Sequence, residues 1–227
     1  MKVLVIIPAY NEEKSIERVV DNLVVNYPEY DYVVINDGSR DNTAAICRRR
    51  GYRFINLPVN LGLAGAFQTG MKYAYEHDYD YAIQFDADGQ HRPEFIRPIV
   101  DKMEEGYDIV IGSRFVEEKK PCSLRMLGSF MISLAIRLTT GVKLKDPTSG
   151  MRMFNRSLMK EFALNINYGP EPDTVSYLVK NGARVTEVQA HMDERLEGQS
   201  YLTLTKSAIY MIRMITSILL IQNFRKR

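Results

Sequence analysis

Short apolar runs rich in β-branched residues alternate with helical patterns over the first 112 residues. Apolar residues at helical spacing predict a first helix behind a cap at Asn11, and further helices near 42–50, 63–76 and 93–105. Strands that alternate with helices form βαβ units, so the pattern predicts an α/β protein with a mostly parallel sheet covered on both faces. The expected buried strands are Val3–Ile7, Tyr32–Ile35, Phe54–Leu57, Tyr81–Phe85 and Ile109–Ile111.

The pattern becomes irregular after Gly112. It predicts a long apolar helix over 123–140, a strand near 151–154, a helix near 174–180 capped by Asp173, and a strand over 184–189. A final helix over 203–224 is apolar almost all round, with a thin polar stripe. Such a helix lies on a membrane surface, on a partner or on another copy of the chain.

Charge is distributed unevenly between the body and the tail. Glu197 is the last acid, and the five cations after it leave a charge of −3 on the body and +5 on the last 30 residues. A mildly acidic body argues against nucleic acid as a partner, whereas a basic, apolar tail suits an anionic membrane surface. Arg213 interrupts the apolar stretch, so we expect the helix to lie flat and not to span, with Ile209, Ile212, Ile215, Leu219 and Ile221 entering the lipid.

Length and composition exclude several classes of protein. A chain of 227 residues suits one globular domain. Cys47 and Cys122 form no C-x-x-C pair and the three histidines are scattered, so no zinc signature is present. The first apolar run is too short for the core of a signal peptide, and we expect a cytoplasmic protein.

Polar turns follow three of the predicted strands, where ligands bind in sheets of this kind. Asp86 and Asp88, one residue apart, can both reach a hard divalent cation, with Gln90 as a third oxygen donor. The alternative is a solvated turn. Neither G-x-G-x-x-G nor Gly-Lys-Ser/Thr is present, which argues against nicotinamide dehydrogenases and P-loop NTPases.

Other turn residues suit a nucleotide. Asp37 can accept a hydrogen bond from a nucleobase, although turn chemistry is the favoured explanation of Asp-Gly-Ser taken alone. Tyr10 and Glu12 can contact the nucleoside, although the helix dipole explains Glu12 equally well. Gly62 and Gly65 can admit a phosphate at a helix start or can serve close packing. Four arginines near small or turn residues can bind phosphate or can be surface cations: Arg114, Arg125, Arg152 and Arg195.

These motifs, in this order over about residues 1 to 200, closely resemble the dolichol-phosphate mannose synthase-like branch of glycosyltransferase family 2. The segments that carry the resemblance are Pro8–Glu12, Asn36–Ser39, Gln84–His91, Gly112–Arg114, Asp146–Arg152 and Glu194–Ser200. The resemblance implies a GT-A fold, which is a Rossmann-like α/β fold, and a nucleotide-sugar donor. One departure leaves the donor open, because Gly62-Leu63 stands where relatives often have Gly-Lys.

The resemblance also implies roles for individual residues. Asp86, Asp88 and Gln90 are expected to hold Mg²⁺ or Mn²⁺. The catalytic set is expected to be Asp88, Asp146, Arg114, Arg125, Arg152 and Arg195. The donor is expected to contact Pro8, Ala9, Tyr10, Glu12, Asp37, Gly62, Gly65, Asp86 and Ala87.

We therefore expect a glycosyltransferase domain at 1–202 and a docking helix at 203–227, peripheral on the cytoplasmic face of the membrane or bound to a small membrane protein. The expected reaction is inverting, metal-dependent transfer from a UDP- or GDP-sugar to polyprenyl phosphate. One alternative is transfer to a saccharide hydroxyl in cell-wall biogenesis, which needs Asp146, Glu171 or Asp173 as a base. Another is a catalytically silent subunit that binds nucleotide-sugar.

Overall fold

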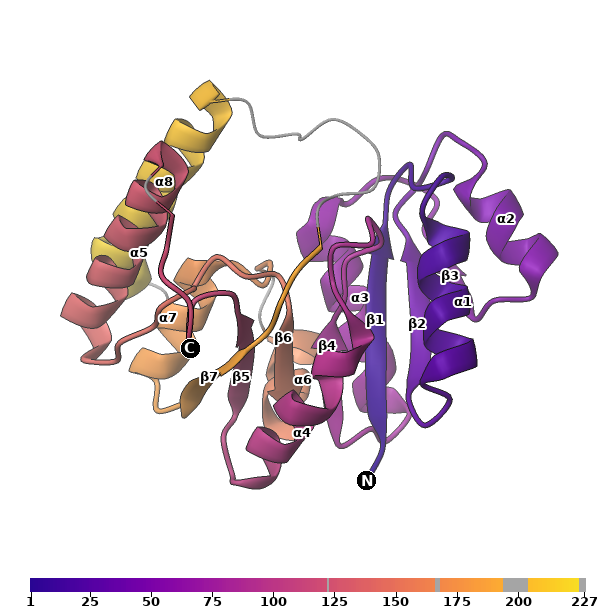
Figure 1. Ribbon diagram of the computed structural model, residues 1–227, viewed down its shortest axis with the longest axis horizontal. Helices are drawn as coiled ribbons and strands as arrows, with labels where there is room; N and C mark the ends of the chain where they lie inside the picture. Colours follow the sequence, from indigo (N-terminus) through magenta and orange to yellow (C-terminus); the bar gives the residue numbers. More distant parts are fainter. Residues whose placement is uncertain (122, 166–167, 194–203, 225–227) are drawn as a thin grey trace.

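The β-branched runs form the strands of one mixed sheet in the computed structural model, which describes residues 1–121, 123–165, 168–193 and 204–224 (Figure 1). The strand order is β3-β2-β1-β4-β6-β5-β7, and β6 runs antiparallel to both of its neighbours while the other paired strands are parallel. The strands are β1 (Val3–Ala9), β2 (Asp31–Asn36), β3 (Phe54–Asn56), β4 (Tyr81–Gln84), β5 (Ile109–Ser113), β6 (Arg152–Asn155) and β7 (Val185–Gln189).

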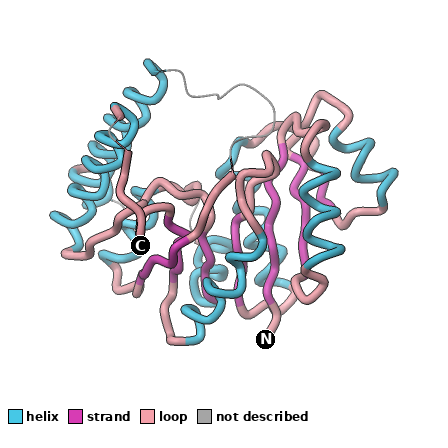
Figure 2. Tube along the Cα trace, viewed as in Figure 1, coloured by secondary structure: helices cyan, strands magenta, loops and turns pink. Residues whose placement is uncertain are grey.

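Helices cover both faces of this sheet, so the predicted α/β architecture is confirmed (Figure 2). One face packs against α1 (Ile16–Asn26), α2 (Thr43–Arg50) and α4 (Ile96–Glu104), which follows the short 3-10 helix η1 (Pro93–Phe95). The apolar core of the other face is shared by α3 (Gly62–Glu76), α5 (Leu124–Thr140), α6 (Arg156–Leu164), α7 (Pro172–Lys180) and α8 (Leu204–Leu219), which leads into η2 (Ile221–Phe224).

Two predicted caps are wrong, and one helix was not predicted. Ser15 precedes α1, whereas Asn11 lies upstream at φ 57° and accepts a hydrogen bond from the backbone of Arg40. Glu171, not Asp173, precedes α7, because Pro172 takes the first helical position. Helix α6 directly follows β6, so its helical pattern merges with the apolar strand in the sequence.

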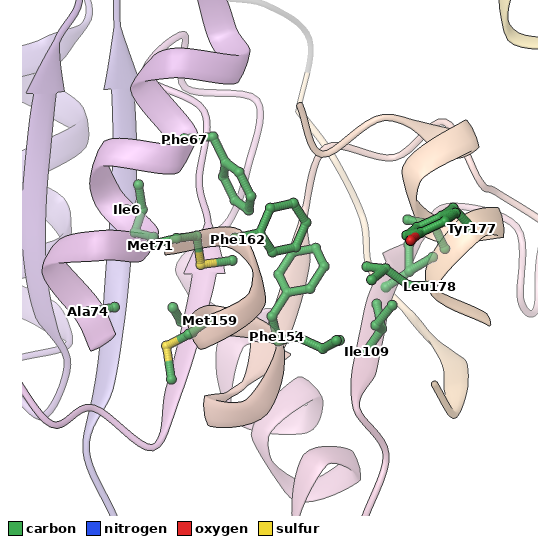
Figure 3. Packing of buried hydrophobic residues seen from close by; sticks show 14 of the residues in the cluster. Ile6, Phe67, Met71, Ala74, Ile109, Phe154, Met159, Phe162, Tyr177 and Leu178 are labelled. Carbon is green, nitrogen blue, oxygen red and sulfur yellow. The ribbon is translucent and has the colours of Figure 1, made fainter. Parts of the chain in front are cut away.

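An aromatic cluster fixes the antiparallel strand β6 between two parallel ones. Phe154 of β6 contacts Phe67 of α3 and Phe162 of α6, and the three rings lie edge to face with centroids 5.1 to 5.6 Å apart (Figure 3). Each ring is fully buried, and such pairs contribute about 0.5–1.5 kcal/mol beyond their burial. The cluster ties the second half of the chain to the first.

Helix α8 lies along α5 at one end of the molecule (Figure 1). The contact is close: a side chain at Gly128 would meet the sulfur of Met211, and Met214 and Ile218 are buried. Among the helices of the described residues, none combines the length and apolar character needed to cross a membrane.

Candidate active site

The predicted motifs meet at one edge of the sheet. Parallel strands β1, β2, β4 and β5 all end there, and antiparallel β6 begins there, so that Arg152 pairs with Gln84 and with Ile111. The turns that follow Ala9, Gln84 and Ser113 therefore face a common region. Topology alone brings together segments that are far apart in sequence.

The first two motifs are hydrogen-bonded to each other. The backbone of Asp37 donates to the carbonyl of Ala9 at 2.9 Å, and the backbone of Asn11 donates to Ser39 Oγ at 3.0 Å. The backbone of Glu12 donates to Thr43 Oγ1 at 2.9 Å, while a Glu12 carboxylate oxygen accepts from Ser15. Pro8 and Tyr10 are half-buried beside this network, and Ala9 is buried.

Asp37 is almost fully buried at the end of β2. Its Oδ1 accepts a hydrogen bond from the backbone of Leu61 at 2.7 Å, and Asn60 Nδ2 donates to its carbonyl at 3.2 Å. These contacts tie the second motif to the loop before α3. The neighbour Gly38 has φ +63°, and a side chain there would lie 2.6 Å from the Asn60 backbone.

The two glycines at the start of α3 differ. Gly62 has φ +74° and open space around it, which leaves room for a ligand. Gly65 packs against Leu61, whose Cβ would lie 2.4 Å from an added side chain. The packing explanation is therefore sufficient for Gly65.

Asp86 is held in place by its neighbours. Gln84 Nε2 donates to Asp86 Oδ1 at 3.1 Å, and the backbone of Asp86 donates to His91 Nδ1 at 2.9 Å. Since Nδ1 accepts, the neutral imidazole carries its proton on Nε2, which faces Asp86 Oδ2 at 3.5 Å. A side chain at Gly150 would lie 2.9 Å from Oδ2, so that glycine keeps the space beside this carboxylate open.

Asp88 and Gln90 complete the turn. Asp88 Oδ1 accepts from the backbone of Gln90 at 3.0 Å, and Gln90 Nε2 donates to the Asp193 carbonyl at 3.4 Å, which leaves the amide oxygen of Gln90 for other partners. Ala87 between the two acids is buried. No group of three His, Cys, Asp or Glu in the described part of the chain could hold a metal, so a metal here must use amide, substrate or water oxygens as well. The oxygen donors present fit Mg²⁺ or Mn²⁺.

Arg114 and Asp146 form a bidentate ion pair. Nε donates to Oδ2 at 2.7 Å and Nη2 donates to Oδ1 at 2.8 Å. Burial opposes ionisation of Asp146, but the hydrogen bonds and charge of Arg114 outweigh it and hold the pKa of Asp146 below its usual value. Asp146 is fully enclosed while Arg114 remains about a quarter exposed, so the arginine is the member that can meet a substrate.

Arg152 lies beneath this surface and is fully buried. Its Nη2 donates to the Pro147 carbonyl at 2.7 Å, and no group among the described residues meets Nε or Nη1. Burial lowers the pKa of Arg152, while the charges of Glu171 and Asp86 act in the opposite direction. The guanidinium is thus an internal cation below the acidic turn, not a surface group.

Two other predicted arginines cannot be placed in the same way. Arg125 lies in the first turn of α5, and the structure describes its backbone only. Arg195 lies outside the described residues.

The three carboxylates considered as a catalytic base all have partners. Asp146 binds Arg114, Asp173 Oδ2 accepts from Ser217 at 2.6 Å, and Glu171 Oε2 accepts from Tyr210 at 2.5 Å. The Tyr210 phenol and the Ser217 hydroxyl come from α8, which therefore contacts the N-terminal end of α7 directly. Burial raises the pKa of Tyr210, so it stays a neutral donor.

Three polar residues around Arg114 were not singled out from the sequence. Lys120 is half-buried and donates to Ser129 Oγ at 3.2 Å, and burial lowers its pKa. Glu187 and Gln189 of β7 bind the backbones of the two loops that carry Arg114 and Asp146. Their spacing of two along a strand was the available signal, because it places both on one side of the sheet.

Comparison with known proteins agrees with this geometry. The family model described as "Glycosyl transferase family 2" matches residues 4–162. An undecaprenyl-phosphate mannosyltransferase of Micrococcus luteus is 32% identical over 89% of this chain and 88% of its own length. A UDP-N-acetylglucosamine–dolichyl-phosphate N-acetylglucosaminyltransferase of Methanococcus voltae is 34% identical over 70% of this chain and 71% of its own.

Solved structures agree on the fold. Glucosyl-3-phosphoglycerate synthase of Mycobacterium tuberculosis, crystallised with Mn²⁺, UDP and phosphoglyceric acid, superposes with a TM-score of 0.70 at 20% identity, over 96% of this chain and 78% of that one. The architecture is the GT-A fold. The chain belongs to glycosyltransferase family 2, in the dolichol-phosphate mannose synthase-like branch, and is a glycosyltransferase.

Proposed function

We propose that the protein transfers a sugar, with inversion, from a UDP- or GDP-sugar to a polyprenyl phosphate. The observation that carries this proposal is the presence of an acidic, oxygen-rich turn at Asp86 and Asp88 together with two cations, Arg114 and Lys120, on the ring of Phe115. The first suits a metal-bound diphosphate and the second suits a phosphate-bearing acceptor. Relatives named for undecaprenyl phosphate and dolichyl phosphate support the acceptor class.

The donor is proposed to lie along the ends of β1, β2 and β4. Tyr10 and Asp37 meet the nucleoside, and the open space at Gly62 admits the diphosphate. Asp86, Asp88 and Gln90 would hold Mg²⁺ or Mn²⁺, which offsets negative charge on the leaving diphosphate. Buried Arg152 adds a fixed positive charge below this turn.

The acceptor is proposed to enter beside α5. A cleft of about 330 Å³ lies there. Its apolar lining is Phe115, Phe130, Leu134 and Leu144, and its charged lining is one acid, Glu118, and four cations, Lys120, Arg137, Lys143 and Lys145. Arg114 and Lys120 both face the ring of Phe115, at 5.2 and 5.5 Å from its centre. Two cations beside an apolar cleft match a phosphate that carries a hydrocarbon chain.

The acceptor phosphate needs no general base. Its second pKa is about 6, so it is largely a dianion at neutral pH and can attack the anomeric carbon directly. A saccharide hydroxyl would need a base, and Asp146, Glu171 and Asp173 are each engaged by a neighbouring side chain. That pattern favours the lipid phosphate over the hydroxyl acceptor. Both metal carboxylates are present, which favours an active enzyme over a silent subunit.

The docking surface is proposed to include α5 as well as the helix at 203–227. On α5, Leu127 and Leu138 are 58% and 72% exposed, and on α8, Ile209 and Ile212 are 61% and 65% exposed. These helices lie side by side (Figure 1), and we propose that their exposed apolar side chains form one apolar face. We place this face on an anionic membrane at the cytoplasmic side, with the domain at 1–202 above it. The exception among the expected lipid contacts is Ile215, which packs against the core.

Substituting Ile209 and Ile212 by glutamate should weaken binding to vesicles of anionic phospholipid at least about 10-fold, because two apolar side chains leave the acyl boundary. Flotation measures this loss. The matched control replaces Val24 and Val25 with glutamate, since they are exposed on α1, away from the apolar face (Figure 1). Equal loss in both variants would show a charge effect alone. If the wild type forms a dimer and does not bind vesicles, and if the double variant is monomeric, the apolar face binds a second copy of the chain instead.

The function itself is tested by incubating the enzyme with Mn²⁺, undecaprenyl phosphate and radiolabelled UDP- and GDP-sugars in turn. We expect one donor to give a labelled lipid that mild acid hydrolyses. If every donor leaves the lipid unlabelled while a saccharide becomes labelled, the hydroxyl acceptor replaces our proposal.

A further inference from the structure

Edge strand β7 presents two polar side chains to the loops that carry the Arg114–Asp146 pair. Glu187 and Gln189 are two residues apart and point to the same side of the sheet. β7 pairs with β5 through its backbone from Val185 to Gln189, so these side chains are not needed for strand pairing. Their contacts are to loop backbones and, for Glu187, also to the side chain of Ser113 at the end of β5.

Glu187 binds the turn that begins with Asp146. Its Oε2 accepts from the backbone of Lys145 and its Oε1 from the backbone of Asp146, both at 2.6 Å. Burial raises the pKa of Glu187, while these two N–H donors oppose the rise. One carboxylate thus fixes one peptide segment through both of its oxygens, which an amide cannot do because its nitrogen is a donor.

Gln189 binds the other loop. Its Nε2 donates to the Arg114 carbonyl at 3.1 Å, and its Oε1 accepts from the backbone of Glu117 at 2.8 Å. Gln189 therefore holds the loop from the Arg114 carbonyl to the Glu117 amide, and Glu187 holds the backbone of the residue whose carboxylate binds the Arg114 side chain.

We propose that Glu187 and Gln189 are positioning residues that fix the direction of the Arg114 guanidinium toward the phosphate of the acceptor. The proposal rests on the proposed function for the identity of that phosphate. A guanidinium binds phosphate well only when its planar fork is oriented, because its hydrogen bonds are directional. The Asp146 carboxylate sets the orientation of the Arg114 guanidinium. Glu187 fixes the backbone of Asp146 and thereby the position of that carboxylate.

Glu187→Gln should lower kcat/KM for undecaprenyl phosphate about 10- to 100-fold, the usual range when a residue that orients a ligand group is lost. The loss should appear mainly in the acceptor KM, with the KM for the nucleotide-sugar changed less than about 2-fold. Glu117→Gln is the matched control, since that side chain is exposed and only its backbone contacts Gln189. We expect wild-type kinetics for it.

A double-mutant cycle separates orientation of Arg114 from a general effect on the fold. In an Arg114→Lys background, which keeps the charge and loses the fork, Glu187→Gln should cost less than about 2-fold. An equal loss in both backgrounds, or no loss when Glu187→Gln is made in the otherwise wild-type enzyme, would overturn the proposal. Gln189→Met should also lower kcat/KM for undecaprenyl phosphate, and it replaces Glu187→Gln as the test variant if Glu187→Gln does not fold.

A measurement without substrate keeps this proposal separate from the proposed function. The Nε–H signal of Arg114, identified by its absence in Arg114→Lys, should exchange with water at least about 10-fold faster in Glu187→Gln, or in Gln189→Met, than in the wild type. An unchanged rate contradicts the proposal even if the enzyme uses polyprenyl phosphate. A faster rate supports the positioning role even if the acceptor is a different phosphate.

Discussion

Asp88→Asn is expected to reduce metal-dependent sugar transfer at least about 10³-fold while the fold stays intact. A metal on the leaving diphosphate supplies several kcal/mol of transition-state stabilisation, and each 1.4 kcal/mol is tenfold in rate. The amide oxygen of asparagine can still accept from the Gln90 backbone, as Asp88 Oδ1 does at 3.0 Å. The free energy of unfolding should therefore change by no more than about 1 kcal/mol.

Initial rates across a Mn²⁺ titration, with thermal unfolding measured in parallel, check this result. Asp101→Asn is the control, because that carboxylate is half exposed in an ion pair with Arg97 on α4. Its rate should match the wild type. An Asp88→Asn enzyme that reaches full activity with Mn²⁺ would remove Asp88 from the proposed metal site.

Ending the chain at residue 203 should lower the free energy of unfolding by about 3–6 kcal/mol. The deletion exposes the surface that Met214 and Ile218 cover, and each fully buried side chain of this size contributes about 1.5–3 kcal/mol. It also leaves Asp173 without Ser217 and Glu171 without Tyr210. A loss of this size is a large part of the stability of most domains.

Urea unfolding followed by circular dichroism measures the difference. Phe224→Ser is the control, since that ring is 83% exposed and its loss should change stability by less than about 0.5 kcal/mol. A truncated chain as stable as the wild type would show that α8 is an appendage. Because deletion removes part of the core, surface substitutions on α8 are the better test of docking.

The strands and their turns could be predicted because burial on both faces leaves continuous β-branched runs, as in Val3–Ala9, and because ligand sites follow such strands. The direction of β6 could not be predicted from the sequence. The four residues of β6 do not indicate which way the strand runs. Its placement depends on Phe154 packing between Phe67 of α3, far away in the sequence, and Phe162 of the α6 helix that follows.

The side-chain pairs within the site could not be predicted from the sequence either. Arg114 and Asp146 were both singled out from the sequence, but nothing in their spacing of 32 residues states that they bind each other. Glu187 has no motif around it, and its role follows only from two backbone N–H groups that the fold brings within 2.6 Å. Sequence motifs identify the residues proposed to contact substrate. The residues that position them, such as Glu187, can be identified only from the tertiary structure.

In the proposed reaction, the attacking oxygen belongs to a lipid phosphate. The most direct test compares undecaprenyl phosphate with undecaprenol in the same detergent, with the same labelled donor and Mn²⁺. We predict transfer to the phosphate and at least about 10³-fold less to the alcohol, because the alcohol is neither ionised at neutral pH nor matched to Arg114 and Lys120. Equal transfer to both lipids, or efficient transfer to a saccharide hydroxyl with none to the lipid phosphate, would contradict the assignment of a lipid phosphate as the acceptor.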